Sequence, residues 1–119
     1  MQAGTFEYAN GIFGPSTATA QGIVTQTQRY NRMAFTISGL ASETISIYIS
    51  YDWNDTSSTG TFGAVAVRPI DLSTGALFAS NTLGNGNFLL VNTPWRAVKF
   101  VKTSTVDNAT IAWACLNAN

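Results

Sequence analysis

The sequence predicts an all-β protein, a single antiparallel β-sandwich or jelly-roll-like domain with an N-terminal arm. Three observations lead to this fold class. Within residues 44–51, isoleucine alternates with serine or tyrosine. Other short segments are rich in β-branched and aromatic residues, and Gly- or Asn-containing turns separate these segments. The turns recur at intervals of about ten residues, which favours antiparallel strands because parallel pairs need crossover connections of roughly a dozen residues or more.

The clearest strand is expected at residues 44–51. There Ile45, Ile47 and Ile49 alternate with serine and tyrosine, and a period of two means that one face of the strand is buried. Further strands are expected at residues 21–27, 33–38, 62–70, 76–82, 88–91, 97–103 and 110–115. Turns are expected at residues 10–11, 14–15, 38–39, 57–60, 71–75, 84–87 and 106–108. Gly and Asn are typical of such turns because they adopt positive φ readily.

The segment 94–102 is open to two interpretations. Its basic residues recur at helical spacing after a proline, which is consistent with a short helix. Val98, Phe100 and Val101, followed by a Thr-rich stretch, instead favour a strand that is buried on both sides or bulged. We prefer the strand.

The first part of the chain is predicted to differ from the rest. Residues 1–18 form an N-terminal arm or a first strand, and residues 19–119 form the β-sandwich domain. Phe6, Tyr8 and Phe13 are scattered through a Gly-containing stretch. We expect them to anchor the arm on its own domain or on a neighbouring subunit.

The composition excludes most catalytic chemistry. Charged residues make up 10% of the chain, histidine is absent and there is one cysteine, whereas catalysis at neutral pH relies mostly on His, a thiolate, a metal or a carboxylate pair. Cys115 lies in an apolar run and is expected to be a buried, inert thiol. The acidic residues form no evident pair of the kind that glycoside hydrolysis needs. We therefore expect no enzymatic activity, no cofactor and no metal.

The charge balance argues against two classes of partner. Six basic residues balance six acidic ones, so the chain lacks the long-range field that attracts nucleic acid or an anionic membrane. A surface poor in charge also tolerates close contact with neighbours, which favours a homo-oligomer. The sequence shows neither a basic and apolar leader nor an apolar run of membrane-spanning length, and we expect synthesis in a reducing cytoplasm.

The densest polar and aromatic cluster directly follows the strand at 44–51. Asp52, Trp53, Asn54 and Asp55 combine a ring on which a sugar can stack with groups that bind sugar hydroxyls. In the other interpretation, Asp and Asn cap a turn while Trp53 folds back onto the core. A calcium loop would need more oxygen ligands. We prefer the turn and keep glycan contact as the alternative.

Two groups of basic residues stand out. Arg29 and Arg32 flank Tyr30, an arrangement also found in proteins that bind single-stranded nucleic acid. Net neutrality argues against that role. The second group is Arg96, Lys99 and Lys102. We expect the residues of both groups to be solvated at strand ends, or their arginines to face carboxylates of an adjoining subunit.

Four segments in the same order resemble small all-β virion proteins of tailed bacteriophages, especially capsid decoration (cement) proteins. They are ISGLASETISI at 37–47, DLSTG at 71–75, NGNF at 85–88 and WRAVKFVKT at 95–103. The similarity spans roughly residues 35–112. It implies a jelly-roll-like subunit that assembles, often as a trimer, on the outside of a phage head, where it binds the major capsid protein and clamps adjacent capsomers. It also implies a virion location after synthesis in the bacterial cytoplasm.

The resemblance does not identify catalytic or contact residues in this chain. From the residues themselves, the candidates for an oligomer or capsid contact are Phe6, Tyr8, Phe13, Arg29, Arg32, Tyr48, Trp95 and Arg96. The alternatives to a decoration protein are a carbohydrate-binding β-sandwich module and a receptor-binding domain of a tail or fibre.

Overall fold

The computed structural model describes residues 2–9, 12–13, 21–25, 32–41, 44–54, 56–91, 96–102 and 109–116. The strands in these ranges are β1 (Gln2–Ala9), β2 (Ile12–Phe13), β3 (Gln21–Thr25), β4 (Arg32–Ser38), β5 (Ile45–Ser50), β6 (Ile70–Asp71), β7 (Ala76–Leu77), β8 (Gly86–Val91), β9 (Ala97–Lys102) and β10 (Ala109–Leu116). Within these ranges no helix is long and apolar enough to cross a membrane.

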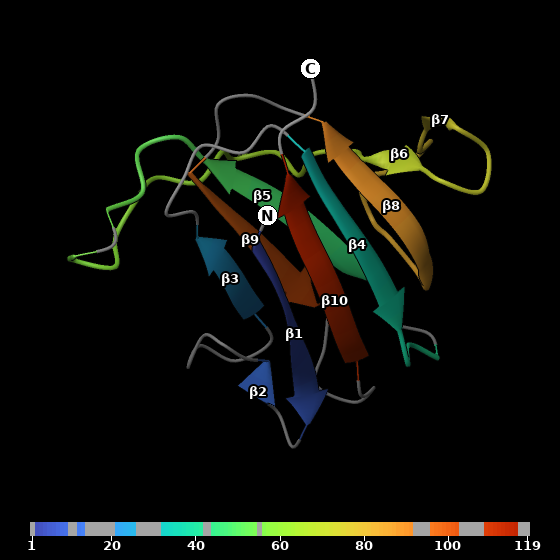
Figure 1. Cartoon of the computed structure of the whole chain (residues 1–119), viewed down its shortest axis with the longest axis horizontal. Helices are drawn as coiled ribbons and strands as arrows, with labels where there is room; N and C mark the ends of the chain where they lie inside the picture. The colour runs from blue at the N-terminus through green and yellow to red at the C-terminus, as the bar shows by residue number, and fades with distance from the viewer. Residues whose placement is uncertain are drawn as a thin grey trace.

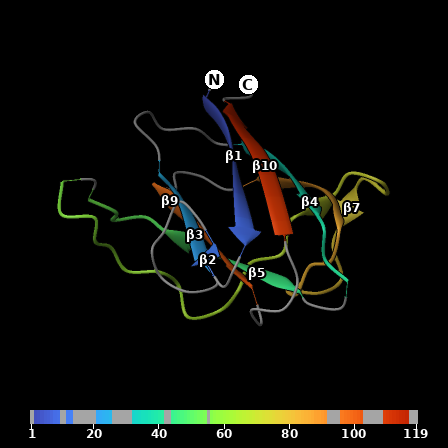
Figure 2. The ribbon, with the colours of Figure 1, turned by 90° about the horizontal axis from the view of Figure 1, so that it is seen from below.

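The strands form two antiparallel sheets. The larger sheet has the order β2-β1-β10-β4-β8-β6-β7, and the smaller sheet has the order β3-β9-β5. Figure 1 shows β1, β10, β4 and β8 in front of the smaller sheet, and Figure 2 shows the two sheets as separate layers. The predicted all-β antiparallel sandwich is confirmed.

The core lies between the two sheets because apolar side chains occupy alternate positions of the strands. In β4, Met33, Phe35 and Ile37 are buried while the residues between them face outward. The three isoleucines of β5 are buried in the same way. Both patterns follow from the side-chain period of two that the sequence shows.

A chain of phenylalanine rings links the two sheets through this core. Phe100 of β9 packs edge-on against Phe35 of β4, with the ring centroids 5.2 Å apart. Phe35 stacks on its cross-strand neighbour Phe88 at 5.4 Å, and Phe88 meets the half-buried Phe78 at 5.5 Å. Ring pairs in these arrangements stabilise the fold beyond the area that they bury.

The ambiguous segment 94–102 contains a strand, as preferred, because β9 pairs with β3 on one side and with β5 on the other. Neighbouring residues of a strand point to opposite faces, yet Ala97 and Val98 are both fully buried. The strand is therefore covered on both sides, as the mixed sequence pattern predicted.

The prediction of a continuous strand at residues 62–70 is wrong. Phe62 and Val67 form isolated bridges to β5, and a regular strand begins only with β6. Gly63 and Pro69 interrupt the run, because glycine weakens a strand and proline has no N–H to donate. The segment runs along the outer edge of β5, where the amides of Gly63 and Val67 donate to β5 carbonyls at 3.0 and 2.9 Å. It thus satisfies an edge that would otherwise be open.

The predicted strand at 76–82 is shortened to β7. After β7 the chain turns so that Phe78 packs into the core edge, and the hydroxyl of Ser80 accepts a hydrogen bond from the amide of Thr82 at 3.1 Å. Such local side-chain bonds compete with strand pairing. The strands predicted at 21–27, 33–38, 88–91 and 110–115 overlap β3, β4, β8 and β10.

The predicted turn at 71–75 is confirmed. The carbonyl of Asp71 accepts a hydrogen bond from the amide of Gly75 at 2.8 Å, and its carboxylate accepts one from the amide of Ser73 at 2.9 Å. Gly75 has a φ of 76°, which glycine adopts without a steric penalty.

At the backbone level, residues 2–9 belong to the larger sheet. β1 pairs with β10 from Gln2 opposite Cys115 to Tyr8 opposite Ala109, and β2 pairs with the end of β1. Residue 18, where the arm was predicted to end, lies outside the described residues, and that boundary stays a prediction.

Candidate functional site

The part of the larger sheet's outer face that β4, β8 and β10 form carries mostly small, uncharged side chains. Because alternate residues of β4 point into the core, Ala34 and Thr36 face outward. The strand register places Ala112 of β10 and Asn87 of β8 on either side of Thr36. Of the outward side chains described on β4, β8 and β10, only that of Arg32, at one end of β4, is charged.

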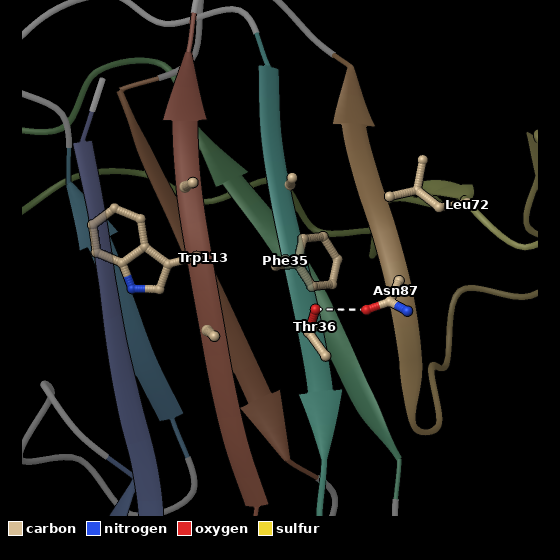
Figure 3. Close-up of a pocket in the computed structure, with 8 residues that line it drawn as sticks. Phe35, Thr36, Leu72, Asn87 and Trp113 are labelled. Carbon is tan, nitrogen blue, oxygen red and sulfur yellow. Dashed lines mark hydrogen bonds between the residues drawn. The ribbon is translucent and has the colours of Figure 1, made fainter.

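A shallow depression of about 340 Å³ lies over this face (Figure 3). It is lined by Ala34, Phe35, Thr36, Leu72, Asn87, Ala112, Trp113 and Ala114. The hydroxyl of Thr36 donates a 2.6 Å hydrogen bond to Oδ1 of Asn87, so these two polar groups already partner each other. Leu72 comes from the turn between β6 and β7 and is 49% exposed. A partner that covers these lining residues therefore has no charge to desolvate.

Asp52 closes the loop that follows β5. Its Oδ1 accepts hydrogen bonds from the amide of Thr61 at 2.8 Å and from the hydroxyl of Ser50 at 2.9 Å. The bond from the Thr61 amide, and next the bond from Ser50, lower the pKa of Asp52 below its ordinary value of 3.8, because both donors favour the ionised form. The carboxylate is therefore charged at neutral pH.

Asn54 builds the turn at the tip of this loop. Its Oδ1 accepts hydrogen bonds from the amides of Thr56 and Ser57 at 2.9 and 3.2 Å, and its backbone pairs with Thr59. The predicted capping of a turn by this residue is thus observed. Figures 1 and 2 show the loop projecting away from the two sheets. Asp55 lies outside the described residues.

Trp53 folds back against the returning side of the same loop. It is half-buried, and its ring centroid lies 5.7 Å from that of Phe62. Gly60 is packed so closely that a Cβ there would lie 2.9 Å from the Cα of Trp53 and 2.8 Å from the hydroxyl of Ser50. The loop is therefore tightly packed at its base.

Lys99 connects this loop to the outer face of the smaller sheet. Its Nζ lies 4.5 Å from the centroid of the Phe62 ring and 5.4 Å from that of Tyr48, and cation–π contacts at exposed sites contribute about 0.5–1 kcal/mol each. Sequence reasoning assigned Phe62 to a strand and did not identify it as a site residue. The bridge that brings Phe62 beside Ser50 is a tertiary contact, and local sequence patterns carry no signal for it.

The structure gathers several predicted site residues at the end of β5. Tyr48 lies in β5, and Asp52, Trp53 and Asn54 follow it. The amide of Arg96 donates to the carbonyl of Ser50, the last residue of β5, at 2.9 Å. Residues predicted separately for subunit contact and for glycan contact therefore share one region.

The remaining predicted contact residues lie elsewhere. Arg32 begins β4 in the larger sheet and is half-buried. Phe6 and Tyr8 belong to β1, and Phe13 belongs to β2. Arg29 and Trp95 lie outside the described residues.

A second depression lies between the end of β5 and the returning side of its loop. It has a volume of about 360 Å³ and is lined by Ile49, Tyr51, Asp52, Thr61, Phe62 and Gly63. Tyr51 is 54% exposed. The volume falls within the range of roughly 300–1,000 Å³ that is usual for small-molecule sites.

Cys115 is buried in the core, as predicted. Burial raises the pKa of its thiol to about 12, so the thiol stays protonated and unreactive at neutral pH. In the described ranges, no three Cys, Asp or Glu side chains are grouped so that they could hold a metal ion.

Comparison with known proteins finds a likeness in structure. No protein-family model matches the chain, and no curated protein matches it in sequence. The fold is similar to that of the SPBc2 prophage-derived protein YomS, known from a crystal structure, with a TM-score of 0.61 and 14% sequence identity. The likeness covers 96% of this chain and 92% of that chain. At this identity, it shows a shared fold.

Proposed function

We propose that this protein is a structural protein of a tailed-bacteriophage virion, specifically a capsid decoration (cement) protein that binds the outside of the head and stabilises contacts between capsomers. Two facts support the proposal. YomS, whose fold is shared over nearly the whole chain, is prophage-derived, and a chain with 10% charged residues and no histidine favours binding over catalysis. In this proposal the protein is made in the host cytoplasm, acts without a cofactor and is carried on the virion.

The outer face of the larger sheet is the observation that carries the proposal. An antiparallel sheet face in contact with water usually bears polar side chains, whereas Ala34, Ala112 and Ala114 give this face small apolar ones. The hydroxyl of Thr36 and Oδ1 of Asn87 are hydrogen-bonded to each other there. Small uncharged side chains let a partner surface approach closely without stripping water from charges. We infer that this face lies against the major capsid protein.

In the same proposal the chain also assembles with itself, most favourably as a trimer. A closed ring of copies binds a shell at several points at once, and this multivalency raises the overall affinity of weak contacts. Arg32, Tyr48 and Arg96 are the predicted contact residues whose side chains the structure describes, and they are the candidates for the contact between copies. Light scattering at micromolar concentration should give a mass of several chains, and a purely monomeric mass would contradict this part of the proposal.

A substitution that introduces a charge on the outer face of the larger sheet tests the proposed decoration function. The variant Ala112→Arg places a cation on an exposed position of that face. We expect an unchanged melting profile but at least about a tenfold loss of protein retained on phage heads, because a buried unpaired charge opposes binding. Retention is measured by quantitative mass spectrometry of gradient-purified particles, and the position of the protein by immunogold electron microscopy.

The matched control is Val65→Arg, which adds the same charge at a position that is 74% exposed in the segment along β5. It should be retained like the wild type. Equal retention of Ala112→Arg would refute the assigned face. Gold label on tails would refute the decoration role, and absence from purified particles would refute a virion role altogether.

A further inference from the structure

We propose that the depression between Tyr51 and Phe62 binds an uncharged sugar ring. The site lies at the end of β5, away from the face assigned to the capsid. The inference goes beyond the proposed structural role, and sugar binding by the free protein does not depend on that role.

Tyr51 and Asp52 supply the two kinds of contact that a sugar needs. Tyr51 lines the depression while more than half of its surface stays exposed, so a pyranose can place its C–H face on the ring. Asp52 lines the same depression as an ionised acceptor. Hydroxyl groups that donate to a charged oxygen make stronger hydrogen bonds than those between neutral groups.

The carboxylate of Asp52 is held in a fixed orientation. The amide of Thr61 and the hydroxyl of Ser50 both donate hydrogen bonds to its Oδ1. The close packing around Gly60 keeps the two sides of the loop together. A site that needs no rearrangement loses less affinity to ordering.

The charge around the depression favours a neutral ligand. Phe62 lines the depression, and the ammonium group of Lys99 lies 4.5 Å from the centroid of its ring. The carboxylate of Asp52 in the lining and the ammonium group of Lys99 beside a lining ring have opposite charges, which offset each other. A polyol can use an ionised acceptor and an aromatic ring without bringing a charge of its own. One shallow site binds weakly, and many copies on one particle would add avidity.

The experiment uses the wild-type chain and simple sugars. Glucose, galactose, rhamnose and N-acetylglucosamine are each titrated into ¹⁵N-labelled protein, up to about 20 mM, which exceeds the millimolar Kd expected of one shallow site. We expect at least one sugar to shift the amide signals of residues 49–52 and 61–63 in a saturable way. No saturable shift with any of them, or shifts centred on the larger sheet, would overturn the proposal.

Three variants test the role of the ring. Tyr51→Ala should weaken binding of the responding sugar about tenfold, and Tyr51→Phe should keep most of it, because stacking needs the ring and not the hydroxyl. Val65→Ala, which removes another exposed apolar group, should bind like the wild type. Wild-type affinity in Tyr51→Ala would overturn the proposal. Retention on phage heads, measured in parallel, should be unchanged in all three and reports separately on the structural role.

Discussion

The two outer faces of the sandwich are built in different ways. On the larger sheet, Ala34, Thr36 and Ala112 line a shallow depression, and the hydroxyl of Thr36 donates a hydrogen bond to Asn87. On the smaller sheet, Tyr48 and Lys99 project toward a loop in which aromatic rings, a carboxylate and an ammonium group meet.

The difference shows how one neutral chain can provide two kinds of surface. A face of small side chains suits extended contact with another protein, because little charge must be desolvated. A loop with an exposed ring and a fixed acceptor suits a small polar ligand. Both rest on one core, so substitutions in the core should affect them together and substitutions in the loop should affect only one.

Phe100→Ala should have the largest effect, because it damages the core that both faces share. Phe100 is fully buried and packs on Phe35 across the sandwich. We expect a loss of about 3–5 kcal/mol in the free energy of unfolding, from lost burial and the cavity that remains. Urea denaturation measures it. Leu77→Ala, at a position 55% exposed, should change stability by less than about 0.5 kcal/mol. A similar small loss in both variants would show that the two faces do not depend on this core contact.

Gly60→Ala should have a smaller effect that is confined to the loop. A Cβ at residue 60 would lie 2.9 Å from the backbone of Trp53, so the two sides of the loop must separate, at a cost of about 1–3 kcal/mol. Amide shifts should change near residues 50–63 and not on the larger sheet.

Gly84→Ala is the control for Gly60→Ala, because a Cβ at residue 84 meets no atom within 4 Å. Its free energy of unfolding should stay within about 0.5 kcal/mol of the wild type. Equal stability of the two variants would mean that the base of the loop accommodates the added Cβ without cost. The packing there would then not hold Asp52 in place.

Acidification should have the smallest effect, and in the loop it should act through Asp52. The folded pKa of Asp52 is lowered, so its hydrogen bonds stabilise the loop above the unfolded pKa, near 3.8, and are lost as the pH falls through the folded pKa. The amide signal of Thr61, which donates to Asp52, should titrate with a midpoint below 3.8. In Asp52→Asn this titration should disappear. A midpoint at or above 3.8 in the wild type would contradict the fixed orientation of the carboxylate.

The sequence by itself determined the fold class, the buried faces of β4 and β5, the turn at 71–75 and the burial of Cys115. These features depend on residues close together in the chain, because side-chain alternation and positive φ are local properties. The tip of the loop was predicted for the same reason, since Asn54 caps amides only two and three residues away.

The tertiary structure alone decided which strands are neighbours and where the sites lie. β1 pairs with β10 across almost the whole length of the chain, and Phe62 reaches Lys99 through a segment whose pattern suggested an ordinary strand. Strand pairing of this kind depends on how the apolar faces pack against each other, and a local pattern is compatible with several partners. The face of small side chains over β4, β8 and β10 and the depression beside Tyr51 exist only because of those pairings.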